Sequence, residues 1–161
     1  MTTDLFCKAP SGRYRKATAT EVQEANSAYV ARQMRGKRLL GSPGDTRRFL
    51  QEYFQGAYAE RFACVFLNAR NAVISAETMF YGTIDGTSVH PREVVRRCLE
   101  LNAAALIVAH NHPSGVAEPS HADRSLTRRL HESVALVDVR LLDHFVIGDG
   151  ETVSFAERGW M

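Results

Sequence analysis

The sequence predicts an α/β (α+β) fold in which one mixed β-sheet is flanked by helices. Short apolar segments rich in branched and aromatic residues alternate along the chain with amphipathic segments of helical period. The length of 161 residues suits one compact domain with a short extension. With 45% hydrophobic and 24% charged residues, the composition is that of a globular protein and excludes a wholly disordered chain.

The N-terminal part is predicted to contain a polar tail followed by a helix. Residues 1–18 are polar and basic, which indicates a mobile or loosely docked tail. Thr20 and Gln23 have the spacing of a capping box and predict that the helix begins there. Gly36 is expected to follow the end of this helix, because glycine is common at that position.

A turn over residues 41–45 (GSPGD) separates this helix from a second one. Asp45 is expected to cap the second helix, which ends at Gly56. Residues 1–56 carry 10 Lys and Arg against 5 Asp and Glu, a net charge of +5, whereas residues 57–161 carry 10 against 13, a net charge of −3. Such a basic segment is typical of a solvated helical face or of a surface that contacts nucleic acid.

The period of the apolar residues then changes to that of strands. Residues 61–68 (RFACVFLN) predict a buried strand, and residues 72–82 predict a second strand after a hairpin-type turn. Pro91 is typical of the first turn of a helix, and the apolar positions that follow it fit one helical face.

The C-terminal third predicts another strand and helix followed by a strand pair. Residues 104–110 are continuously apolar, which is typical of a central strand. Residues 111–119 contain the turn residues of a loop, and a helix is expected over about 120–133. Residues 139–155 predict two strands around a turn at residues 148–150.

Several classes of protein are excluded by what the sequence lacks. No segment approaches the roughly 18 consecutive apolar residues of a membrane-spanning helix, and the N-terminus has no apolar core of a secretory signal. Cys7, Cys64 and Cys98 form no CxxC pair and are expected to be reduced thiols. We therefore expect a cytoplasmic protein that does not associate with membranes.

The residues best suited to chemistry lie in the segment 109–123 (AHNHPSGVAEPSHAD). His110 and His112 are two residues apart at the end of a predicted strand, so both imidazoles point to the same face. Asp123 lies in the first turn of the next predicted helix, from which it can supply an oxygen ligand. Two His and one carboxylate with an open fourth position are typical of a catalytic zinc site. Fe²⁺, Mn²⁺ and Co²⁺ accept the same ligands.

The same residues also have a purely structural interpretation. Ser120 and Asp123 have the spacing of a helix N-cap and an acidic residue at the third helical position, which requires no metal. A His-x-His pair by itself is more often structural than catalytic. The order of strand, His-x-His, loop and Ser-x-x-Asp helix within one short segment favours the metal site.

The pattern His-x-His-x(7)-Ser-x-x-Asp resembles the JAMM signature of the MPN/JAB zinc metalloproteases. Further segments, in the same order, are similar to the RadC-like branch of that fold: GTIDGTSVHPREVVRRCLELNAAALIVAHNHPSG, PSHAD, LLDHFVIG and VSFAERGW. The resemblance implies an MPN/JAB (cytidine-deaminase-like) domain over residues 45–161, preceded by a basic, largely helical extension over residues 1–44. RadC-like proteins often carry an N-terminal helix-hairpin-helix module. This chain is too short to be expected to contain one, so it resembles the short form found in prophage and plasmid loci.

The resemblance also implies roles for individual residues. His110, His112 and Asp123 are expected to bind one Zn²⁺ per chain. Ser120 is the motif serine, whose hydroxyl would orient the attacking water or stabilise the tetrahedral oxyanion.

The general base of the family is a Glu on an early strand, well upstream of the histidines. Glu60 lies immediately before the predicted strand 61–68 and matches this position best. Glu77, on the next predicted strand, is the competing candidate.

Three further residues near these motifs have weaker interpretations. His121 is expected to face solvent on the new helix rather than to bind the metal. His144 is expected to be a hydrogen-bonded structural residue or a support for a metal ligand. Asp143 is a candidate to orient the ring of His144.

The function implied by the resemblance is that of a JAMM zinc metallopeptidase or isopeptidase, in which a zinc-activated water attacks an amide of a peptide or protein substrate. The alternative is a nucleic-acid-associated DNA-repair or mobile-element accessory protein, with a zinc site that is structural or inactive. A nucleobase deaminase is disfavoured because the chain has no CxxC motif, and the HExxH zinc motif is also absent. Nucleic-acid contact through the basic extension and assembly into a homodimer are left open by the sequence.

Overall fold

The computed structural model of the chain describes residues 4–38, 43–82 and 88–161. Its centre is a five-stranded sheet whose strands, in spatial order, are β4 (Val73–Tyr81), β3 (Arg61–Leu67), β5 (Ala105–Asn111), β6 (Arg140–Ile147) and β7 (Thr152–Ser154). β3 is antiparallel to both β4 and β5, β5 is parallel to β6, and β6 is antiparallel to β7. The predicted mixed sheet is therefore confirmed.

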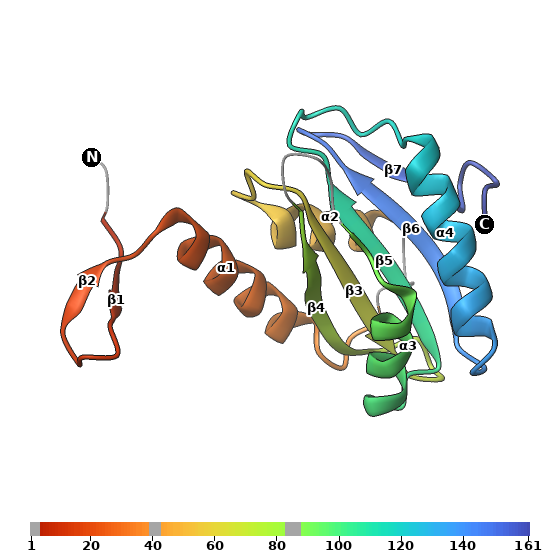
Figure 1. Ribbon diagram of the computed structural model, residues 1–161, viewed down its shortest axis with the longest axis horizontal. Coiled ribbons are helices and arrows are strands. Elements are labelled where there is room, and N and C mark those ends of the chain that lie inside the picture. Colours follow the sequence, from red (N-terminus) through yellow and green to blue (C-terminus); the bar gives the residue numbers. More distant parts are fainter. Residues whose placement is uncertain (1–3, 39–42, 83–87) are drawn as a thin grey trace.

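Helices lie against both faces of this sheet (Figure 1). In the described ranges they are α1 (Ala19–Met34), α2 (Pro43–Phe54), α3 (Pro91–Glu100) and α4 (His121–Ala135). Alternation along β3 divides the core, because successive side chains of a strand point to opposite faces. Phe62, Cys64 and Phe66 pack toward α3 and α4, whereas Ala63, Val65 and Leu67 pack toward α1 and α2.

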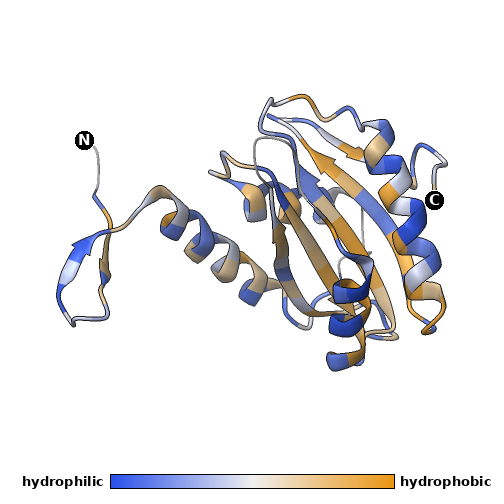
Figure 2. Ribbon diagram, in the orientation of Figure 1, coloured by the Kyte–Doolittle hydropathy of each residue, from blue (hydrophilic) through white to orange (hydrophobic). Residues whose placement is uncertain are grey.

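The centre of the sheet is apolar enough to explain why β3 and β5 are inner strands. All seven residues of β3 and all seven residues of β5 are buried. Figure 2 shows that hydrophobic residues are concentrated in the strands, whereas α3 and α4 carry hydrophilic stretches. Burial of such an apolar sheet between two helical layers supplies the main driving force for folding.

The N-terminal residues do not form the predicted loose tail. β1 (Phe6–Lys8) and β2 (Tyr14–Lys16) form an antiparallel hairpin that projects away from the five-stranded sheet (Figure 1). Gly12 adopts a φ of +82° in the connecting turn, a conformation that favours glycine. An ion pair of 2.6 Å between Arg15 and Glu21 ties the hairpin to the first turn of α1.

The first helix begins slightly earlier than predicted. Thr18, not Thr20, is the N-cap of α1, and Thr18 and Glu21 form the capping box. Gln23, which was expected in that capping box, is buried and donates its amide to the backbone oxygen of Tyr53. This bond joins α1 to α2, so the packing of the two helices decides which of the two capping patterns is used.

The second helix also begins before its predicted cap. Asp45 lies within the first turn of α2 rather than at its N-cap. The predicted turn at residues 41–45 falls partly on residues 41 and 42, which lie outside the described residues. α2 ends at Phe54, and Gly56 follows with a φ of +79°, in agreement with the predicted end.

The other predicted strands and helices are confirmed, with boundaries that differ by at most a few residues. All three cysteines are free thiols, as expected. None of the helices in the described residues is long and apolar enough to cross a membrane. The boundary between an extension over residues 1–44 and a domain over residues 45–161 stays a prediction.

Gly148 lies where two loops approach each other closely, and its replacement should destabilise the fold. A Cβ at this position would lie 2.3 Å from the backbone oxygen of Gly115 and 2.8 Å from the nitrogen of Ala117. Because both atoms belong to backbone, Gly148→Ala is expected to lower the free energy of unfolding by about 1–3 kcal/mol, measured by urea denaturation. Unchanged stability would contradict this packing.

Candidate metal centre

The three predicted metal ligands meet at one end of the sheet. His110 and His112 lie at the end of β5, and Asp123 is the third residue of α4. His110 is paired with Phe62 in the β3–β5 register, so its ring lies on the face of the sheet that α3 and α4 cover. Since α4 begins directly over this strand end, Asp123 reaches the two imidazoles from above the sheet.

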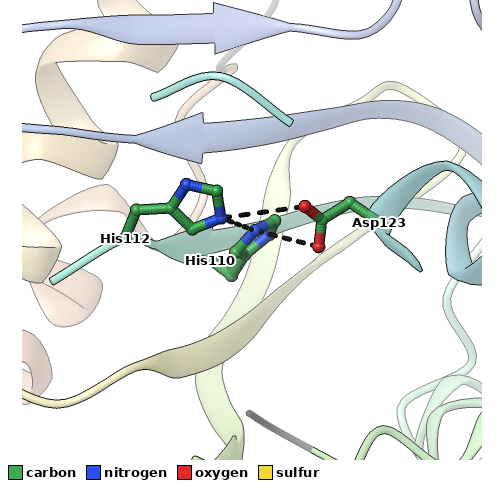
Figure 3. A group of neighbouring side chains, drawn as sticks. All are labelled: His110, His112 and Asp123. Carbon is green, nitrogen blue, oxygen red and sulfur yellow. Dashed lines mark hydrogen bonds and ion pairs between the residues drawn. The ribbon is translucent and has the colours of Figure 1, made fainter. Parts of the chain in front are cut away.

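The donor atoms of these residues form a compact cluster (Figure 3). The Nε2 atoms of His110 and His112 are 3.0 Å apart. One carboxylate oxygen of Asp123 lies 3.3 Å from Nε2 of His110, and the other lies 3.7 Å from Nε2 of His112. His110 is buried, whereas His112 and Asp123 are partly buried, so the cluster is open to solvent on one side.

Hydrogen bonds fix the tautomer of His112. Its Nδ1 lies 2.9 Å from the backbone oxygen of Val116, and a carbonyl can only accept a hydrogen bond. The proton of a neutral His112 ring must therefore be on Nδ1. Its Nε2 is left with a free lone pair that points into the cluster, which is the state a metal ligand needs.

The tautomer of His110 follows from a longer chain of hydrogen bonds. The hydroxyl of Thr127 donates its one proton to the backbone oxygen of Asp123, at 2.7 Å. Nδ1 of His144, 2.6 Å from that hydroxyl, must therefore be the donor, and its Nε2 the acceptor. Nδ1 of His110 donates to this Nε2 at 2.9 Å, which leaves a free lone pair on Nε2 of His110.

His144 can serve as this acceptor only if its ring is neutral, and its surroundings keep it so. Complete burial, and then the nearby charge of His110, hold the pKa of His144 well below its usual range. The ring is enclosed by aromatic side chains. Phe155 stacks on it with 4.7 Å between the ring centres, and Phe62 contacts it edge-on with 5.7 Å between the ring centres.

Two free lone pairs 3.0 Å apart, beside a carboxylate, require a positive charge between them. Protons supply it in the absence of a metal: the hydrogen bond to Asp123 raises the pKa of His112. Burial alone would raise the pKa of Asp123, but its bonds with His110 and His112 outweigh this and hold it well below the usual range. A divalent cation fits the same position, because two imidazoles and a carboxylate are its preferred ligands, and its binding would release these protons.

Ser120 is the N-cap of α4, as the structural interpretation predicts. Its hydroxyl accepts from the backbone nitrogen of Asp123 at 3.1 Å and donates to the Asp123 carboxylate at 2.6 Å. The carboxylate in turn accepts from the backbone nitrogen of Ser120 at 2.7 Å. Ser120 therefore orients Asp123, and its predicted contact with an oxyanion would require the hydroxyl to turn away from that carboxylate.

The two candidate general bases have different environments. Glu60 directly precedes β3. In the antiparallel β3–β5 register Phe62 is paired with His110, and continuing this register by two residues places Glu60 opposite His112. The charge of Glu60 contributes to the raised pKa of His112. Glu77 instead accepts from Arg97 at 2.7 and 2.9 Å and from Ser75 at 2.7 Å. Glu60 is therefore the candidate that lies beside the metal-ligand cluster, and its role as a general base stays a prediction.

The weaker interpretations have mixed outcomes. His121 is exposed on α4, as expected. Asp143 does not orient the ring of His144, because both ring nitrogens are bonded elsewhere. Asp143 accepts instead from the hydroxyl of Ser154 at 2.5 Å and from the backbone nitrogens of His144 and Ala156. It holds β7 and the C-terminal turn against β6.

A cleft of about 550 Å³ opens beside the cluster. It is lined by His112, by the loop that follows it, by the end of α2, and by the turn at residues 148–150. The lining includes Gly115, Gly148 and Gly150, and His112 is the one metal-ligand candidate among its described residues. Backbone groups are suited to binding an extended polypeptide, because they offer regularly spaced donors and acceptors.

This fold and this site define the class of the protein: the model of the RadC-like JAB domain family matches residues 40–160, and the chain belongs to that family. A UPF0758 protein of Vibrio vulnificus is 52% identical over 157 residues, which are 97% of this chain and 70% of that protein. UPF0758 proteins of Vibrio atlanticus and Stutzerimonas stutzeri are 56% and 52% identical over 140 residues. Those matches cover 87% of this chain and 62% of each relative.

Thr127 completes the support of His110 and was not among the residues predicted from the sequence. Thr127 lies four residues after Asp123, so the helical period places both on one face of α4, and this spacing is a signal that could have been used. Its bond to His144 could not be inferred in the same way, because it depends on β6 lying beside β5 in the sheet.

Proposed function

We propose that this chain is a metal-dependent hydrolase of the JAMM type that cleaves peptide or isopeptide bonds, with Zn²⁺ as its metal. The observation that carries the proposal is the pair of imidazole lone pairs fixed by hydrogen bonds and directed at the same point as the Asp123 carboxylate. Membership of the RadC-like JAB domain family supports the same reading.

The metal ligands in this proposal are His110, His112 and Asp123. When bound, Zn²⁺ supplies a Lewis acid that polarises a carbonyl and makes water more acidic. Glu60 accepts the proton of the attacking water and donates it to the leaving nitrogen. Ser120 keeps Asp123 oriented, and its hydroxyl donates to the oxyanion if it turns from the carboxylate.

The cleft beside His112 supports a polypeptide substrate. An extended chain in this cleft would lie against the loop at residues 113–115 and the turn at residues 148–150. Its scissile amide would then lie beside the metal ligands. Glycine at positions 115 and 148 lets the loop and the turn approach each other closely along this lining.

The test is hydrolysis of a degenerate peptide library, together with Lys-linked isopeptides, by the zinc-loaded full chain in H₂¹⁸O. We expect new carboxyl ends that carry one ¹⁸O atom, which mass spectrometry detects, and no cleavage by chelator-treated protein. Zinc addition should restore the cleavage. A folded, zinc-loaded chain that cleaves no member faster than the chelated protein would overturn the proposal.

Contact with nucleic acid stays a prediction. Arg15 and Lys16 of the hairpin are already paired with Glu21 and Asp4. Lys8 and Arg13 form no ion pair with any residue in the described part of the chain, so the uncompensated positive charge of the hairpin itself lies near its turn.

A further inference from the structure

Arg61 is a buried cation that forms no ion pair in the described part of the chain. It is the first residue of β3 and points to the opposite face of the sheet from Phe62, toward α1 and α2. Only 4% of its surface is exposed, and its Nε and Nη1 atoms have no hydrogen-bond partner among residues 4–38, 43–82 and 88–161. Its guanidinium lies 5.1 Å from the centre of the Tyr81 ring. A buried charge that is left unpaired is costly, so this position favours a ligand that compensates it.

Arg61 lines a pocket of about 350 Å³ between α1 and the edge of the sheet at β4. The rings of Tyr53 and Tyr81 and the methyl group of Ala76 provide apolar walls, and Thr78 adds a hydroxyl. The pocket has room for a molecule of about the size of an amino acid, because one water occupies only about 30 Å³. It lies across the sheet from the His110 face and belongs to no part of the proposed hydrolase site.

The charges around the pocket narrow the chemistry of the ligand. Glu77 is neutralised by its bonds with Arg97. Glu24, on α1, lines the same pocket and has no hydrogen bond or ion pair within the described residues. Among its described lining residues, the pocket therefore holds one cation without an ion pair, Arg61, and one carboxylate without an ion pair, Glu24. A simple anion would compensate the charge of Arg61, but it would be repelled by the nearby carboxylate of Glu24.

We propose that this pocket binds a small zwitterion, an α-amino acid, whose carboxylate pairs with Arg61 and whose ammonium group pairs with Glu24. The two tyrosine rings favour an apolar or aromatic side chain. Arg61 directly follows Glu60, so the residue that binds the carboxylate of the ligand is adjacent in sequence to the proposed general base. The site does not depend on the proposed hydrolase activity.

The test is isothermal titration of the full chain with L-phenylalanine, with 3-phenylpropionate, which lacks the ammonium group, and with 2-phenylethylamine, which lacks the carboxylate. An amino acid can also chelate zinc, so each titration is repeated on Asp123→Ala protein treated with a chelator. We expect phenylalanine to bind both proteins equally, and to bind more tightly than either analogue.

Two variants separate this site from simple hydration of a buried arginine. Arg61→Met should weaken phenylalanine binding about tenfold or more, because a charge-assisted pair is lost, while the thermal midpoint without ligand does not fall. Glu24→Gln should weaken phenylalanine but not 3-phenylpropionate. The proposal is overturned if phenylalanine at 10 mM produces no binding heat, if Arg61→Met binds it as wild type does, or if it binds only where zinc is retained.

Discussion

Glu60→Gln is expected to lower kcat for peptide hydrolysis by about 10²–10⁴-fold while the protein keeps its metal. Glu60 lies opposite His112 in the continued β3–β5 register, and its charge acts on that ring. Glutamine has the same shape but cannot accept the proton of the attacking water. Because Glu60 is not a member of the ligand cluster, zinc content should remain at the wild-type level.

Glu77→Gln is the matched control for this prediction. The Glu77 carboxylate is held by Arg97 and Ser75, so its replacement should weaken the contact between β4 and α3 and leave the rate unchanged. Rates are measured by single turnover at saturating peptide. If Glu60→Gln stays within twofold of the wild-type rate, or if Glu77→Gln loses as much, the assignment of the base is wrong.

His144→Phe is expected to weaken zinc binding by about 10–100-fold, the usual effect of removing a group that orients a metal ligand. His110 donates Nδ1–H to His144, and this bond leaves Nε2 free for the metal. Phenylalanine fills a similar space between Phe155 and Phe62 but accepts no hydrogen bond. Competition with a chromophoric chelator measures the affinity.

Two further variants distinguish orientation of the ligand from loss of packing. Thr127→Val removes the hydroxyl to which His144 donates, and it should weaken zinc binding by a smaller factor. Phe155→Leu removes the ring stacked on His144 and should lower the thermal midpoint without changing zinc affinity. Wild-type zinc affinity in His144→Phe would show that the hydrogen-bond chain has no influence on the site.

The elements that sequence reasoning predicted well are those with a strong periodic or capping signal. Apart from Arg61 at the start of β3 and the last two residues of β5, the two strands are apolar throughout, and both are confirmed as inner strands. Ser120 is confirmed as the N-cap of α4, because serine with an acidic residue three positions later satisfies the free backbone groups of the first turn. The convergence of His110, His112 and Asp123 follows from the end of β5 and the start of α4.

What the sequence did not predict depends on packing between distant segments. The strands of the β1–β2 hairpin have three residues each and are mostly exposed, so they carry no hydrophobic alternation. Thr18 and Thr20 both have a capping partner three residues later, and only the burial of Gln23 against α2 decides between them. His144 reaches His110 because β6 lies parallel to β5, a pairing that no local pattern reveals.

The most direct test of the metal centre is the metal content of the protein purified without chelators, beside His112→Ala, Asp123→Ala and His121→Ala variants. His121 is the matched control, since it lies in the same segment but is exposed. Elemental analysis should find about one zinc per chain in wild type and His121→Ala, and none in His112→Ala and Asp123→Ala. Folded wild-type protein without stoichiometric metal, even after zinc is supplied, would contradict a metal site at His110, His112 and Asp123.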